Sequence, residues 1–103
     1  GAEPPSVAEL AAAVGHDPLP VLRFLERDGR VTQVEEERYY LTSALSALID
    51  TIRTGMVGGR VYSPAELRDL TGLSRKYLIP FLEYCDRRGI TARRDSGRIR
   101  NGT

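Results

Sequence analysis

The chain has 103 residues, of which 41% are apolar and 28% are charged, a composition typical of an ordinary folded domain. No apolar run approaches the roughly 20 residues that a membrane-spanning helix needs, and no signal-peptide pattern opens the sequence, so we expect no membrane partner. The single cysteine, Cys85, cannot form an internal disulfide. Cytoplasmic residence is therefore the expectation.

The small net charge of +1 hides an asymmetry between the two halves. Residues 1–50 contain four Lys and Arg against nine Asp and Glu, whereas residues 51–103 contain eleven against five. Such an asymmetry predicts a polyanionic partner for the basic half. The alternative is that the separated charges serve only solubility.

The first half opens with helix signals. Ser6 and Glu9 have the spacing of a capping box, and Gly15 follows as a residue suited to end the helix. Asp17-Pro18 then predicts the start of a second helix, because Asp caps well and Pro is tolerated at the first helical position. We expect that helix to end by Gly29.

A hairpin closes this half. Residues 31–34 and 39–41 are rich in β-branched and aromatic side chains, which predicts two strands. The segment Glu35–Glu37 joins them, so the hairpin is acidic.

The second half repeats these signals with one helix more at its start. Apolar spacing predicts a helix over residues 44–54, followed by a short strand at Val61-Tyr62. Ser63 and Glu66 form another capping box, and Gly72 closes the helix that they begin.

A long helix is predicted from Ser74 to about Arg88, followed by a hairpin of residues 90–94 and 98–100. Pro80 falls beyond the first turn, where it removes one backbone hydrogen bond. We expect either a kink there or a separate first turn at residues 75–77.

The two halves are an internal repeat with an offset of 57 residues. Ser6, Ala8, Glu9, Leu10 and Gly15 recur as Ser63, Ala65, Glu66, Leu67 and Gly72, and Phe24, Leu25 and Glu26 recur as Phe81, Leu82 and Glu83. The order helix, strand, helix, turn, helix, hairpin is that of a winged helix, a variant of the helix-turn-helix. The predicted fold is mainly α with small β-hairpins (α+β), arranged as tandem winged-helix domains. The first domain comprises residues 1–41 and lacks its opening helix and strand. The second comprises residues 42–103.

Basic residues gather at two places that a winged helix can use. Arg75 and Lys76 lie at the start of the long helix, where backbone N–H groups and the helix dipole favour an anion. The other candidates surround the last hairpin: Arg60, Arg93, Arg94, Arg98 and Arg100. Strand alternation puts Arg98 and Arg100 on one face. The alternatives are a solvated helix end and an edge hairpin that merely resists pairing.

Two roles are open for Tyr77, since it can stack on an unpaired base or lie in the core with its hydroxyl outward; the spacing favours the core. Cys85 lies on the predicted buried stripe without metal-ligand spacing, and His16 stands alone beside a turn. No catalytic set, metal site or phosphate loop is present in the sequence. We therefore expect a binding module without cofactor, not an enzyme.

Residues 74–86 carry a family resemblance. Ser74-Arg75-Lys76-Tyr77, the proline four residues after the lysine, and Leu82-Glu83-Tyr84 before an acidic residue resemble the C-terminal winged helix of bacterial SelB, the selenocysteine-specific elongation factor. The ending Gly89–Arg94 is similar to its strand and wing. The resemblance is looser over the first half, which is similar to the penultimate winged helix.

The resemblance implies recognition of the selenocysteine-insertion (SECIS) hairpin of messenger RNA, downstream of a UGA codon, through its backbone and an extruded base. Arg75, Lys76 and Tyr77 match the helix-start motif, and Arg93, Arg94 and Arg98 match the basic wing. Arg60 and Arg100 are added on charge alone. The resemblance further implies a spacer role for the first winged helix, contact with the ribosome through the remainder of the factor, and no GTP site here. We expect a monomer.

Two other functions fit the same fold. A regulator that binds double-stranded DNA would need polar side chains on the long helix to contact base edges. That helix instead offers Ile79, Pro80, Glu83 and Asp86. A protein-interaction scaffold would not depend on Arg75 or Lys76.

Overall fold

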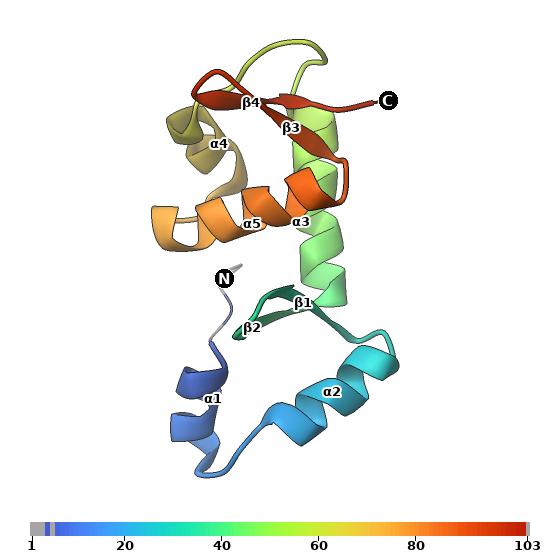
Figure 1. Cartoon of the computed structure of the whole chain (residues 1–103), viewed down its shortest axis with the longest axis vertical. Helices are drawn as coiled ribbons and strands as arrows, with labels where there is room; N and C mark the ends of the chain where they lie inside the picture. The colour runs from blue at the N-terminus through green and yellow to red at the C-terminus, as the bar shows by residue number, and fades with distance from the viewer. Residues whose placement is uncertain (1–3, 5, 103) are drawn as a thin grey trace. The chain divides into compact units, whose positions relative to one another are not determined.

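The computed structural model describes Pro4 and residues 6–102 (Figure 1). The chain divides into two compact units, residues 1–46 and 47–103, and the boundary falls inside helix α3 (Thr42–Gly55). Five helices and two small antiparallel hairpins make up the described part, which confirms the predicted fold class. None of these helices is both long and apolar enough to cross a membrane.

Unit 1 has the order helix, helix, hairpin. Its elements are α1 (Val7–Val14), α2 (Leu19–Arg27), β1 (Val31–Glu35) and β2 (Arg38–Leu41). The predicted capping box is confirmed, because the Glu9 N–H donates to Ser6 Oγ at 3.1 Å and the Ser6 N–H donates to Glu9 Oε1 at 3.2 Å. Gly15 ends α1 with a φ of 77°, a conformation that favours glycine.

Packing in unit 1 is concentrated on the hairpin. The buried apolar residues are Leu22, Val31, Val34, Tyr40 and Leu45. No residue of α1 is buried, and Leu22 is the single buried residue of α2. The two helices of this unit therefore bury little of their apolar surface.

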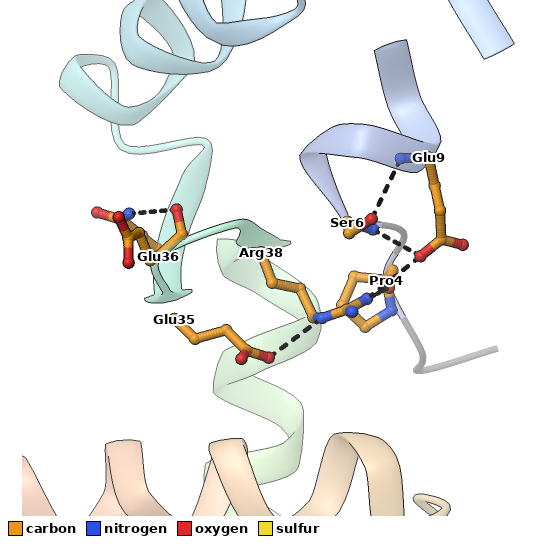
Figure 2. A network of polar contacts seen from close by, with 7 residues as sticks. Pro4, Ser6, Glu9, Glu35, Glu36 and Arg38 are labelled. Carbon is orange, nitrogen blue, oxygen red and sulfur yellow. Dashed lines mark hydrogen bonds and ion pairs between the residues drawn. The ribbon is translucent and has the colours of Figure 1, made fainter. Parts of the chain in front are cut away.

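Arg38 is the centre of a polar network in unit 1 (Figure 2). Its Nε donates to Glu35 Oε2 at 3.1 Å, and its Nη1 donates to the carbonyl of Pro4 at 2.8 Å. Nη1 also lies 3.8 Å from Glu9 Oε1. Because the side chain is largely buried, these contacts fasten the second strand of the hairpin to the segment that begins α1.

Unit 2 begins with most of α3 and continues through α4 (Pro64–Thr71), α5 (Arg75–Arg87), β3 (Thr91–Arg94) and β4 (Gly97–Arg100). The second capping box, Ser63 with Glu66, is also confirmed. Tyr62 forms the predicted short strand as a single antiparallel bridge to Arg98, with backbone hydrogen bonds of 2.8 and 3.0 Å. This order is that of a winged helix, with β3 and β4 as the wing.

Helix α5 is continuous from Arg75 to Arg87 with Pro80 inside it, so the expected separate first turn is wrong. The Ser74 carbonyl accepts hydrogen bonds from the N–H groups of Tyr77 and Leu78 at 3.0 and 2.9 Å, which begins the helix before the proline. Pro80 removes a single intrahelical donor, which the packing of the rest of the helix offsets. The residues of α5 that are buried are Leu78, Phe81, Leu82, Tyr84 and Cys85.

Candidate nucleic-acid interface

The start of α5 presents two cations to solvent. Arg75 and Lys76 are both exposed on its first turn. A cation at a helix N-terminus slightly opposes the helix dipole, so this placement favours a role in binding over one in folding. Tyr77 is half-buried, and its ring centroid lies 5.4 Å from Lys76 Nζ. The ring is therefore partly core and partly surface.

A cavity of about 290 Å³ lies between α4 and α5. Pro64, Ala65, Leu78 and Ile79 give it apolar walls, and Arg68 and Arg75 line it as well. Sequence reasoning missed Arg68, which is exposed on α4. The available signal was the helix-turn-helix itself, since it brings its first helix against the start of the second.

The wing supplies two more exposed cations, Arg93 and Arg94. Both belong to β3, where Arg93 pairs with Arg98 and Arg94 pairs with Gly97 across the hairpin. Both lie next to the turn of the wing, where Asp95 has a positive φ of 55°.

Arg98 was expected in the basic surface, but in the structure it lies in the interior of unit 2. Its side chain is buried, and its Nε donates to both carboxylate oxygens of Asp86 at 3.2 and 3.1 Å. Its Nη2 donates to Asp86 Oδ2 at 3.0 Å. The guanidinium thus fastens the wing to α5 and faces away from solvent, so we remove Arg98 from the candidate contacts.

Arg100 and Arg60 also have partners within unit 2. Arg100 is half-buried, and its Nη1 donates to the carbonyl of Arg53 at 2.8 Å, in the last turn of α3. Arg60 pairs with Glu66 at 2.6 Å and stacks over the Tyr62 ring at 4.5 Å from its centroid. Arg60 remains exposed while paired, whereas Arg100 is held by the fold.

The start of α4 lies between the two exposed groups of cations. Pro64 and Ala65 share the cavity with Arg75 of α5, while Tyr62, just before α4, pairs with the wing at Arg98. In Figure 1 the turn of the wing and the first turn of α5 lie on the same side of unit 2. We define the basic face as the five exposed cations around this point: Arg68, Arg75, Lys76, Arg93 and Arg94.

The described residues contain no metal-binding cluster, and their cysteine is buried. No group of three His, Cys, Asp or Glu side chains suited to a metal ion occurs among residues 4 and 6–102. Burial raises the pKa of the Cys85 thiol to about 12, so the sulfur stays protonated and unreactive near neutral pH.

Comparison with known proteins identifies the family. A family model described as elongation factor SelB, winged helix, matches residues 61–100. The mRNA-binding domain of elongation factor SelB from Escherichia coli, solved in complex with SECIS RNA, aligns at 31% identity and a TM-score of 0.79 over 99% of this chain and 87% of that domain. The chain belongs to the SelB family.

Curated SelB relatives agree with this assignment. The selenocysteine-specific elongation factor of Desulfomicrobium baculatum is 38% identical over 73 residues, which are 71% of this chain and 12% of that protein. The factor of Escherichia coli K12 is 32% identical over 102 residues, 96% of this chain and 17% of that protein. The chain therefore spans less than a fifth of the length of these SelB relatives.

A second solved SelB-type structure supports the fold alone. It is a bacterial selenocysteine-specific elongation factor, EF-Sec, with 23% identity and a TM-score of 0.77. The match covers 97% of this chain and 16% of that one.

Proposed function

We propose that this chain binds the SECIS hairpin of messenger RNA through the basic face of unit 2, and so supports selenocysteine insertion at UGA. The observation that carries the proposal is the 31% identical E. coli domain, which matches 99% of this chain and was solved with SECIS RNA bound. Residues 42–103 would then be the last winged helix of a SelB factor, and residues 1–41 part of the one before it.

The chemistry of the basic face suits the backbone of an RNA loop. Arg75 and Lys76 stand at the N-terminus of α5, where the helix dipole also attracts phosphate. Arg93 and Arg94 add planar guanidinium groups that match phosphate geometry. Proteins that recognise RNA by sequence mostly contact loops and bulges, because the A-form major groove is too narrow for side chains.

Tyr77 and Arg60 take supporting roles in this proposal. The exposed part of the Tyr77 ring, beside Lys76, flanks an unpaired base by stacking. Arg60 remains exposed but is paired with Glu66, so it contacts a phosphate only by exchanging this partner. Arg68, which lines the cavity between α4 and α5, adds a further positive charge beside Arg75.

Unit 1 has the opposite electrostatic character, and we assign it no RNA contact. Its hairpin carries Glu36 and Glu37, both exposed, which would repel a phosphate backbone. We propose that it is a spacer within a longer, cytoplasmic SelB factor that reaches the ribosome through its other parts. We assign the chain neither catalysis, cofactor nor GTP binding, and we propose that it acts as a monomer.

A binding titration tests the proposal. The chain is titrated with an RNA hairpin that has an apical loop and one bulged base, beside a DNA duplex of equal length, at two salt concentrations. We expect hairpin affinity at least tenfold above duplex affinity. Charge reversal in Arg75→Glu or Lys76→Glu should abolish the preference, whereas Arg27→Glu, an exposed and equal charge change in unit 1, should leave it intact.

Two outcomes contradict the proposal. Equal or tighter binding to the duplex would indicate a DNA-binding winged helix. Absence of binding to both nucleic acids at low salt would leave a protein-interaction scaffold.

A further inference from the structure

Arg60 and Glu66 form an exposed ion pair beside the basic face of unit 2. Arg60 Nη2 donates to Glu66 Oε2 at 2.6 Å, and the two side chains are 57% and 44% exposed. Ion pairs as exposed as this one stabilise a fold little, because water solvates both partners when they separate. The pair therefore opens at a small cost in free energy.

Each partner has a second contact that does not depend on the pair. The Arg60 guanidinium stacks over the ring of Tyr62 at 4.5 Å from its centroid, and Tyr62 is buried. The other carboxylate oxygen, Glu66 Oε1, accepts the Ser63 N–H at 3.0 Å in the capping box of α4. Each side chain thus retains one anchor when the pair opens.

The internal repeat separates this pair from helix capping. Glu9 is the equivalent of Glu66, and it completes the same capping box at the start of α1. The position equivalent to Arg60, 57 residues earlier in the sequence, is a glutamate. A capping glutamate therefore does not require this arginine, and capping does not explain the pair.

The pair lies along the segment that joins the two groups of exposed cations. Tyr62 is bridged to Arg98 in the second strand of the wing. A few residues on, Ala65 lines the cavity that Arg75 of α5 also lines. A phosphate backbone that contacts both the wing and the start of α5 would pass beside this segment.

We propose that Glu66 is a specificity-determining residue of the RNA-binding surface, because its carboxylate occupies the place on Arg60 that a phosphate of the RNA takes. This inference rests on the proposed function and adds a step to it. In the free chain the pair is neutral, so it attracts a distant polyanion little. An RNA that brings a phosphate to Arg60 displaces the carboxylate, since a guanidinium suits both groups. A nucleic acid that places no phosphate there gains nothing from Arg60.

The first experiment removes both charges at once. The double variant Arg60→Gln, Glu66→Gln keeps the net charge and the capping box, which accepts glutamine as well as glutamate. It should bind an RNA hairpin with an apical loop and one bulged base about threefold or more weakly. The slope of log affinity against log salt should fall by about 0.7–0.9, because one phosphate contact is lost.

Unit 1 offers a matched control for the double variant. Arg30 Nε lies 2.9 Å from Asp28 Oδ2 in another exposed ion pair. The double variant Arg30→Gln, Asp28→Asn removes that pair with the net charge again unchanged. It should alter neither the hairpin affinity nor the salt slope, because unit 1 makes no RNA contact in the proposed function.

Glu66→Gln alone frees Arg60 and tests specificity. Hairpin affinity should rise by up to about fivefold, because the exposed pair no longer has to open. Affinity for a DNA duplex of equal length should rise more, since the duplex gains Arg60 as a new phosphate contact, so the preference for the hairpin should fall. Glu9→Gln removes the same charge from the equivalent capping box and should leave both affinities unchanged. Circular dichroism checks that each variant is folded.

Several outcomes overturn the inference. A double variant Arg60→Gln, Glu66→Gln that binds like the unaltered chain would show that the pair stays closed on RNA. A Glu66→Gln chain whose hairpin affinity does not rise, or whose duplex affinity rises no more than its hairpin affinity, would show that the carboxylate does not compete for Arg60.

The same titrations separate this inference from the proposed function. Absence of hairpin binding by the unaltered chain, or binding that survives Arg75→Glu, would overturn both. Hairpin binding that depends on Arg75, combined with an unaffected double variant at positions 60 and 66, would overturn this inference alone.

Discussion

The guanidinium of Arg98 and the carboxylate of Asp86 form a buried two-point pair that joins the wing to α5. Nε donates to Oδ1 and Oδ2 at 3.2 and 3.1 Å, Nη2 donates to Oδ2 at 3.0 Å, and Thr91 Oγ1 donates to Oδ1 at 2.6 Å. In unit 1, Arg38 occupies a similar place in its hairpin and is also largely buried in a polar network. Both units thus use one arginine of the second hairpin strand for folding.

The first prediction removes this pair. Asp86→Ala leaves the Arg98 charge buried and unpaired, so we expect it to lower the free energy of unfolding by about 3–5 kcal/mol. Urea denaturation followed by circular dichroism measures the loss. Arg94→Ala, which truncates an exposed wing arginine, should change stability by less than about 0.5 kcal/mol. Equal effects of the two substitutions would contradict the structural role of the pair.

Sequence patterns were sufficient to predict the elements of this fold. The prediction succeeded because helix ends are set by local interactions. The capping boxes at Ser6 and Ser63 and the glycines at positions 15 and 72 each act on residues within one helical turn. The types of residue in the basic surface were also visible. Their partners were not, since Arg98 meets Asp86 twelve residues away and Arg100 meets the Arg53 carbonyl at a separation of 47.

The sequence also did not predict which face of the wing packs against the rest of unit 2. Alternation correctly places Arg98 and Arg100 on one side of β4, and the hairpin register agrees. Alternation does not say which side meets the rest of the domain, because that depends on how the hairpin packs on α3 and α5. Arg68 was missed for a related reason, since its cavity exists only when α4 and α5 pack together.

The second prediction concerns Cys85. Burial, followed by the neighbouring negative charge of Asp86, raises the pKa of its thiol to about 12. Because the pKa is raised in the folded state, the associated stability is complete below the unfolded-state pKa and declines as pH rises through the folded value. We expect reaction with a thiol reagent at pH 8 to be at least a hundredfold slower in the native chain than in urea. Comparable rates in both conditions would show that the thiol is accessible.

The third prediction concerns the capping box of α4. The hydrogen bond from the Ser63 N–H, with the positive charge of Arg60, lowers the pKa of Glu66 despite an opposing desolvation effect. A lowered folded-state pKa contributes stability above the unfolded pKa, and this contribution is lost as pH falls through the folded value. Glu66→Gln should therefore reduce the loss of stability between about pH 5 and pH 3. Thermal unfolding across that range measures it, and an unchanged acid profile would contradict the assignment.

The fourth prediction concerns Gly97 at the start of β4. A Cβ at this position would collide with the carbonyl oxygen of Tyr62, which accepts a hydrogen bond from the Arg98 N–H. Gly97→Ala should push the wing off this strand and lower stability by about 1–3 kcal/mol. Ser96→Ala, the neighbouring exposed position, is the control and should be nearly neutral. Chemical shifts of the Tyr62 and Arg98 amides report whether the bridge is lost.

The last prediction separates contact arginines from structural ones by their salt dependence. Each phosphate neutralised by a side chain adds about 0.7–0.9 to the slope of log affinity against log salt. Arg93→Ala and Arg94→Ala should each weaken RNA-hairpin binding and reduce this slope by roughly that amount, with stability unchanged. Arg100→Ala should lower stability, because the Arg53 carbonyl loses its donor. It should leave unchanged the salt dependence of RNA binding by the protein that remains folded. A slope that falls for Arg100→Ala but for neither Arg93→Ala nor Arg94→Ala would contradict the assignment of the RNA contacts to the exposed arginines of the wing.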